Sequence, residues 1–179
     1  NFPFKFSARA EFAVDGANFV TTVTLTNQDT QPFPAGFGHH PYFVRDAGNT
    51  VQVEIPCDSR FELVNALASA PPVPVTPETD FRALRPLGTR VYEELLTGRR
   101  GSLAARMTYP QVSLAMIADE LFEHVLLFAP DGQPYFAVEP MSNANDGFNL
   151  YANGVVGNGV FELAPGESKT GTVTLQMEP

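Results

Sequence analysis

The sequence is poor in cysteine and in basic residues. Its 179 residues include one cysteine, Cys57, so an intrachain disulfide is excluded and no CxxC zinc pattern occurs. Eleven Lys and Arg stand against twenty Asp and Glu, which gives a formal net charge of −9. Nucleic acids and anionic membranes are bound largely through Lys and Arg. We therefore expect neither as a partner. The single thiol is compatible with a reducing compartment, and we expect a cytoplasmic protein.

Long apolar runs are also missing. No stretch approaches the ~20 consecutive apolar residues that a membrane helix needs. The first six residues have the pattern of a strand and not of a signal peptide. Because the chain lacks an initiator Met and opens inside this pattern, we expect a further N-terminal segment of the same protein. We count this segment among the expected partners of residues 1–179.

Alternation of apolar and polar residues dominates the rest of the chain, and this period of two is typical of half-buried strands. Fifteen Phe and five Tyr favour strands over helices, and sixteen Pro with fourteen Gly indicate many turns. The expected fold class is all-β, an antiparallel two-sheet β-sandwich. We expect residues 1–179 to form a single domain that is incomplete at its N-terminus.

The clearest alternation lies in the first 25 residues. Phenylalanines and small apolar residues from Phe4 to Val14 share one parity, and Asp15-Gly16 predicts a turn. The pattern resumes from Phe19 to Leu25. We therefore expect a long hairpin whose phenylalanine face points into the core. Further strands are predicted around residues 51–55, 103–107, 112–116, 124–129, 135–139 and 170–177.

Two stretches interrupt the strand pattern. Residues 70–86 are rich in proline, and a helical turn is expected at Phe81 to Leu84. Residues 141–159 are rich in Asn and Gly and are expected to form a surface loop. Long irregular loops on a β scaffold often carry function.

Two adjacent histidines, His39 and His40, precede Pro41. Neighbours in an extended segment point to opposite faces, so at most one of them faces a given cleft. Pro41 cannot donate a ladder hydrogen bond, which places the segment at a sheet edge or strand end. One interpretation is a turn with two hydrogen-bonded imidazoles, and the other is an acid–base histidine.

Glu139 ends an otherwise apolar strand next to the polar 141–159 loop. Partial desolvation there would raise its pKa and make it a better base near neutral pH. The alternative is an ordinary strand-end carboxylate exposed to water. Asp146 and Asn149 in the loop have the character of turn-forming residues.

Other polar residues have simpler interpretations. The pair Glu93-Glu94 is either solvated or offers a carboxylate to a hydroxyl group of a ligand. His124 begins a buried strand and is expected to be a hydrogen-bonded core histidine. The chain has no nucleophile elbow, P-loop or Rossmann fingerprint, and its histidines lack the spacing of a zinc site, so neither a metal nor a cofactor is expected.

Four segments, taken together and in this order, resemble motifs of the aldose 1-epimerase (galactose mutarotase-like) family, in its C-terminal portion. They are residues 38–43 (GHHPYF), 79–82 (TDFR), 138–149 (VEPMSNANDGFN) and 163–167 (LAPGE). The first resembles the family's H-x-Y-F segment, and the third resembles its late Glu strand with the loop that follows. The resemblance implies His40 as general acid and Glu139 as general base, and it implies substrate binding by His39 and Tyr42.

The chain departs from the family pattern at two places. A substrate-binding aspartate in a D-x-x-F segment is matched by Glu93, with Leu96 at the aromatic position. The family also uses an arginine and a histidine near an H-G-G segment upstream, and this chain has no match to them.

The resemblance implies interconversion of the α and β anomers of a hexose by acid–base ring opening and closure, without metal or cofactor. The rival hypotheses are a hexose-phosphate epimerase, which should show arginines at the cleft, a non-catalytic carbohydrate-binding or sensor domain, and a structural interaction domain. Convergence of His40 and Glu139 on one polar site would favour catalysis. The resemblance, aligned on Tyr42-Phe43, implies that His40 faces it, and strand parity then turns His39 away.

Overall fold

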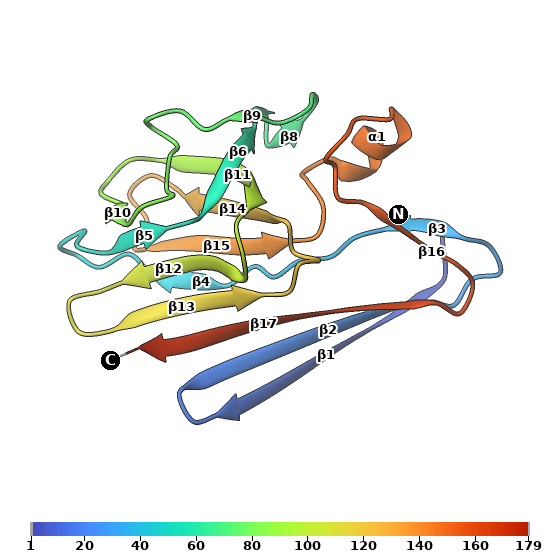
Figure 1. The fold of residues 1–179 in the computed structure, drawn as a ribbon, viewed down its shortest axis with the longest axis horizontal. Helices are drawn as coiled ribbons and strands as arrows, with labels where there is room; N and C mark the ends of the chain where they lie inside the picture. Colours follow the sequence, from blue (N-terminus) through green and yellow to red (C-terminus); the bar gives the residue numbers. More distant parts are fainter. Residues whose placement is uncertain (1, 179) are drawn as a thin grey trace.

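Two antiparallel sheets packed face to face form the molecule, which confirms the expected all-β sandwich (Figure 1). The computed structural model describes residues 2–178. The seven-stranded sheet runs in the order β1 (Phe6–Asp15), β2 (Asn18–Asn27), β17 (Ser168–Glu178), β13 (Ser113–Ala118), β12 (Leu103–Thr108), β5 (Gln52–Glu54) and β10 (Arg85–Pro86). The six-stranded sheet runs β4 (Tyr42–Val44), β15 (Tyr135–Met141), β14 (His124–Ala129), β11 (Tyr92–Arg99), β6 (Cys57–Phe61) and β9 (Val73–Pro74).

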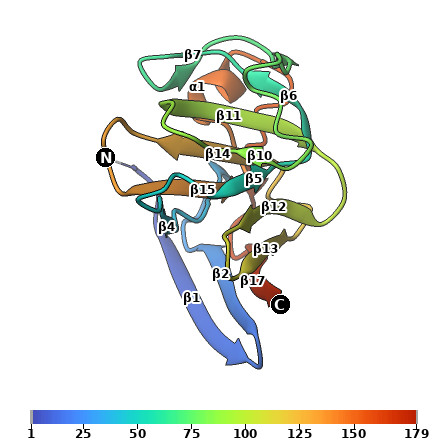
Figure 2. The same cartoon turned by 90° about the vertical axis from the view of Figure 1, so that its left-hand side faces the viewer.

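Smaller elements flank the sheets. Two ribbons are formed by β3 (Phe33–Ala35) with β16 (Phe161–Leu163), and by β7 (Leu63–Val64) with β8 (Leu67–Ala68). A helix, α1 (Gly147–Ala152), lies on the same side of the molecule as β7 and β8 (Figures 1 and 2). Among residues 2–178, no helix has the length and apolar character that crossing a bilayer requires.

The main core lies between the two sheets. Val53, Met107 and Met116 enter it from the seven-stranded sheet and are fully buried. Val125 and Leu127 enter it from β14, and the residue between them, Leu126, is buried on the other face against Leu150 of α1. The continuous apolar run 124–129 is therefore a strand covered on both faces, because only such a strand needs apolar side chains at successive positions.

The β1–β2 hairpin forms with the expected turn, but its phenylalanine face is not in the core. Phe6, Phe12, Val14 and Phe19 are exposed, at 46%, 65%, 77% and 42% of their surface. The predicted inward face is wrong for β1 and Phe19, which the six-stranded sheet does not cover, but it is confirmed for Thr21 and Leu25 of β2, which are buried. The hairpin extends away from the six-stranded sheet (Figure 2).

The two irregular stretches differ from expectation in detail. Residues 81–84 form a bend and not a helical turn, since Phe81 is buried in the core and packs edge-on against Tyr92 at 5.2 Å. The 141–159 stretch contains α1, where a surface loop is expected. This helix has one buried large side chain, Leu150, so the sequence shows no apolar helical period there.

Candidate active site

Strand register places His40 directly opposite Glu139. In the pairing of β4 with β15, Tyr42 faces Ala137, and a bridge farther along joins Gly38 to Met141. Continuing this register puts His40 and Glu139 opposite each other, with their side chains on one face. β4 is an edge strand, as the proline that precedes it predicts.

The side chains of this pair are in contact. Nε2 of His40 lies 3.1 Å from Oε1 of Glu139. The approach is too poorly aligned for a hydrogen bond, so Oε1 is a buried acceptor without a donor. The His40 side chain is 52% exposed and that of Glu139 only 6%, so the imidazole lies between the carboxylate and the solvent.

Burial of Glu139 tunes its acidity. Desolvation raises the pKa of the Glu139 carboxyl to about 7, because the apolar surroundings disfavour the charged form. The desolvation expected from the sequence is thus confirmed. A carboxylate whose pKa lies near neutrality can both take up and return a proton, as a general base must.

Aromatic rings lie beside this pair on the same face of the sheet. The His40 ring lies 4.7 Å from the Tyr42 ring, and Tyr42 in turn meets Tyr135 edge-on at 5.2 Å. Tyr42 and Tyr135 are both partly exposed on the sheet face that carries Glu139. Exposed rings beside a few converging polar groups are the usual composition of a small-molecule site.

Glu93 shares this face of the sheet. It lies opposite Phe128 on β14, and Phe128 lies opposite Ala137 on β15. Glu93 is exposed, two strands away from β15. The neighbouring Glu94 is on the other face, where its carboxylate lies 3.7 Å from the guanidinium of Arg60. The structure thus places Glu93, and not Glu94, on the candidate site's face.

His39 does not join the pair. Its backbone N–H donates to the carbonyl of Pro140 at 3.0 Å, and strand parity directs its side chain to the opposite face from His40. It is half-buried, and burial lowers the pKa of its imidazole. Its proposed contact with substrate stays a prediction.

His124 lies two residue pairs along the ladder from Glu139, on the same face and opposite Met141. It is fully buried, as expected, but neither ring nitrogen has a hydrogen-bond partner, so the expected hydrogen bonding is wrong. Its ring packs edge-on against Phe61 at 5.7 Å. Burial lowers the pKa of His124 to about 4, which keeps the imidazole neutral.

Ser142 joins the two motifs and is not evident from the sequence. Its hydroxyl accepts a hydrogen bond from the N–H of Phe37, and its own N–H donates to the carbonyl of Phe37, both at 2.9 Å. The side chain is buried. Ser142 therefore holds the segment that leads to His40 against the segment that leaves Glu139. A lone serine in an Asn-rich and Gly-rich stretch carries no signal for this role.

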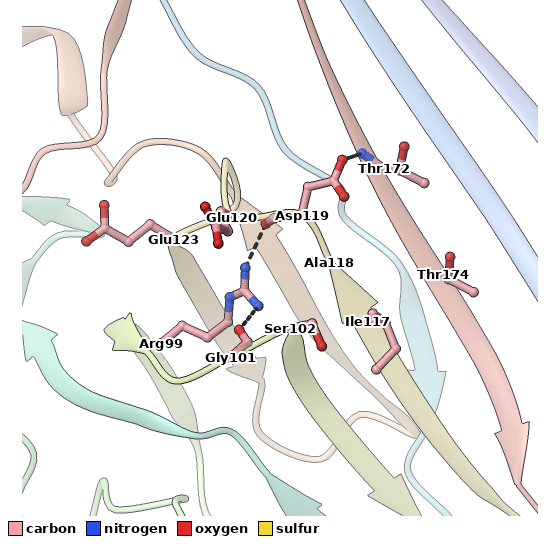
Figure 3. Close-up of a pocket in the computed structure, with 10 residues that line it drawn as sticks. All are labelled: Arg99, Gly101, Ser102, Ile117, Ala118, Asp119, Glu120, Glu123, Thr172 and Thr174. Atoms are coloured by element: carbon pink, nitrogen blue, oxygen red, sulfur yellow. Dashed lines mark hydrogen bonds between the residues drawn. The ribbon is translucent and has the colours of Figure 1, made fainter.

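A separate hollow of about 500 Å³ shares no residue with this site (Figure 3). Arg99 is its most prominent polar group, but the guanidinium already donates to the carbonyls of Gly101, Asp119 and Phe122. Arg99 thus links chain segments through these hydrogen bonds. We therefore place the chemistry at His40 and Glu139. Within residues 2–178, no group of three or more His, Cys, Asp or Glu side chains is arranged to hold a metal ion.

Comparison with known sequences points to one family. The sequence model of the family described as Aldose 1-epimerase matches residues 1–176. The Escherichia coli (strain K12) protein YphB, described as uncharacterized, is 27% identical over 176 residues, which are 93% of this chain and 58% of YphB.

Solved structures agree on the fold. A putative aldose 1-epimerase from Escherichia coli K12 superposes with a TM-score of 0.84 at 25% identity, over 98% of this chain and 61% of that one. A galactose mutarotase-like protein from Clostridium acetobutylicum gives 0.85 at 16% identity, over 99% and 57%. Galactose 1-epimerase from Lactobacillus acidophilus NCFM gives 0.79 at 14% identity, over 98% and 58%. The last two similarities concern the fold alone, and the chain spans about three fifths of each relative.

Proposed function

Since the chain belongs to the aldose 1-epimerase family, we propose that it catalyses the interconversion of α and β anomers of a free hexose. The observation that supports this most is the contact of His40 Nε2 with Glu139 Oε1 at 3.1 Å on an aromatic sheet face. The anomeric hydroxyl oxygen and the ring oxygen of a pyranose are bonded to the same carbon. An acid and a base that serve them must therefore lie side by side, as these two groups do.

The proposed reaction moves two protons and breaks one bond. Glu139 takes the proton of the C1 hydroxyl, and protonated His40 gives a proton to the ring oxygen O5. The C1–O5 bond breaks, C1 becomes an aldehyde carbon, and O5 becomes a hydroxyl. Rotation about C1–C2 presents the other carbonyl face, and the reverse transfers close the ring. Positioned acid–base transfer contributes about 10²- to 10⁴-fold.

The surrounding residues have binding roles in this proposal. Tyr42 and Tyr135 offer ring faces and hydroxyls beside the pair, and Glu93 offers an exposed carboxylate on the same sheet face. The partner is thus a monosaccharide. The same proposal includes a further N-terminal segment that supplies more orienting groups. It also includes a cytoplasmic location, with which the one free thiol is compatible.

Polarimetry on freshly dissolved α-glucose and α-galactose tests this proposal, with buffer catalysis subtracted. His40→Ala and Glu139→Gln should each lower kcat/KM by about 10²-fold or more. His39→Ala is the comparison for the acid role and is judged on kcat, because it removes a neighbouring imidazole on the opposite face whose predicted role is in substrate binding. Loss of activity in His39→Ala with full activity in His40→Ala would reverse the assignment.

A non-catalytic sugar-binding domain is the alternative from a different functional class. It predicts that the chain binds hexoses but leaves their anomerisation rate at the buffer value. Isothermal titration with glucose and galactose, run beside polarimetry, separates these outcomes. A hexose-phosphate epimerase is not favoured, because the side chains that converge here, those of His40, Tyr42, Tyr135 and Glu139, include no arginine.

A further inference from the structure

Leu126 is the neighbour of Glu139 on the adjacent strand. In the pairing of β14 with β15, these two residues lie directly opposite each other. The side chains of such a pair lie on one face of the sheet, with their β-carbons about 5 Å apart. Both are buried, with 8% of Leu126 and 4% of Glu139 exposed. The side chain of Leu126 therefore covers the side of the carboxylate that faces β14, where water would lie on an open sheet face.

An apolar cluster holds Leu126 in this place. It joins strands of the six-stranded sheet to α1 and to the segment that follows Glu139. Its buried members are Phe61, Ala68, Leu95, Leu126, Ala144 and Leu150, and Met141 packs against them. All of these residues lie between positions 61 and 150, so a further N-terminal segment would leave their contacts in place.

Charged and titratable groups also surround Glu139. Within residues 2–178, those on the same face of the sheet or at the start of the helix that covers it are His40, Tyr42, Glu93, His124, Tyr135 and Asp146. Of these groups, His40 contacts the carboxylate, at 3.1 Å. None of them is an arginine or a lysine. No permanent cation among them compensates for the loss of water, which agrees with burial as the cause of the raised pKa of Glu139.

We propose that Leu126 is a positioning residue for the reaction, which acts through Glu139 by excluding water and hydrogen-bond donors from its carboxylate. This inference rests on the proposed function and adds to it a residue that has no proton to transfer. A desolvated carboxylate is the stronger base once it is ionised, but a smaller fraction of it is ionised at a given pH. Leu126 thus sets the balance between the strength of the base and the fraction available.

Leu126→Thr and Leu126→Val form a matched pair of variants. Both new side chains are β-branched, suit a strand and have nearly the same shape, so they remove the same packing. Threonine alone brings a hydroxyl, which can donate to Oε1 of Glu139, an oxygen that has no donor. A hydrogen bond to the charged form lowers a carboxyl pKa. The difference between the two variants therefore separates the polarity beside the base from the loss of volume.

Carbon-13 NMR of glutamate-labelled protein follows the Glu139 carboxyl directly, and Glu139→Gln identifies its signal. We expect a midpoint near pH 7 in the wild type and in Leu126→Val, and one about a pH unit lower in Leu126→Thr. Leu95→Thr makes the same exchange opposite Leu126 on β11, one strand farther from Glu139, and should leave the midpoint unchanged. Equal midpoints in Leu126→Thr and Leu126→Val overturn the inference. A wild-type midpoint near 4.5 does so too, and that result requires no variant to fold.

Polarimetry gives a second readout and separates this inference from the proposed function. Relative to the wild type, Leu126→Thr should raise kcat/KM about threefold at pH 5, where more of its base is ionised, and lower it about threefold at pH 8, where its base is weaker. A merely structural loss would lower kcat/KM at both pH values and would overturn the inference. If no form of the protein accelerates anomerisation, the proposed function fails, while the NMR midpoints still decide whether Leu126 shields Glu139.

Discussion

Gly159 lies so close to the ring of His124 that a β-carbon at residue 159 would come within 2.5 Å of Nε2. It would also collide with the carbonyl oxygen of Ser142. Gly159 further has a φ of +72°, a conformation that side chains disfavour. The lack of room for a β-carbon and the positive φ therefore require glycine at residue 159.

Gly159→Ala should destabilise the fold by more than about 2 kcal/mol, because strain at positive φ adds to a clash with backbone. Urea unfolding gives the value. Gly132→Ala is the control, since Gly132 has a φ of +62° but no atom within 4 Å of the added carbon. Equal losses in the two variants would show that the contact with His124 and Ser142 is unimportant.

The neutral state of His124 should make stability depend on pH. The pKa is about 4 in the fold, below the ordinary 6.5, so the unfolded chain binds more protons between these values. The contribution of His124 is therefore complete above pH 6.5 and falls by up to about 3 kcal/mol as the pH drops to 4. His124→Leu should lack this dependence, measured as the difference between its unfolding free energy and the wild-type value at each pH. A difference that stays constant from pH 4 to 7 would contradict the prediction.

Glu139 should have the opposite effect on stability. Its pKa in the fold is raised to about 7 from 4.5, so its contribution is complete below pH 4.5 and is lost as the pH rises through 7. Glu139→Gln should be up to about 3 kcal/mol more stable than the wild type at pH 8, and equal to it at pH 4. The same variant should lose about 10²-fold or more in kcat/KM, as expected when a destabilising buried group serves function. Glu93→Gln, on an exposed part of the same face, should change stability little at either pH.

The rate of anomerisation should rise with pH as Glu139 loses its proton. A base with a pKa of about 7 predicts an ascending limb in which kcat/KM increases tenfold per pH unit well below 7. Polarimetry in non-catalytic buffers gives the profile. An ascending limb near pH 4.5 would mean that the base is a solvated carboxylate other than Glu139.

Tyr42 should contribute to binding through its ring. Tyr42→Ala removes the ring beside His40 and should raise KM roughly threefold to tenfold. Tyr42→Phe keeps the ring and should stay within about twofold of the wild type. If Tyr42→Phe shows the full loss, the hydroxyl and not the ring carries the contact. A fall in kcat without a change in KM would indicate that Tyr42 positions His40.

Local alternation predicted the relative orientation of the candidate site's side chains, whereas the family resemblance selected His40 and Glu139. The period of two separates His39 from His40, and the same period puts Glu139 on the face of Tyr135 and Ala137. These relations depend on neighbours in sequence, so no knowledge of the whole sheet is needed. The desolvation of Glu139 followed from the apolar strand that precedes it.

Strand order could not be predicted in the same way. Phe12 and Phe19 have the pattern of core residues, yet their exposure depends on where the hairpin lies in the sheet. That place is set by the pairing of β2 with β17, about 150 residues later in the chain. Similarly, Leu150 of α1 is buried in the same apolar cluster as Leu126 of β14, which no local pattern in the sequence shows.

The facing positions of His40 and Glu139 also restrict how the length of the chain can vary. Adding or deleting one residue between His40 and Tyr42, or between Ala137 and Glu139, would turn one of the two groups to the other side of the sheet. Insertions in the exposed turn at Gly132 would leave the ladder untouched, and their entropic cost grows slowly with length. Among homologues that keep both groups, gaps in an alignment should therefore fall in the turns and never inside these two short segments.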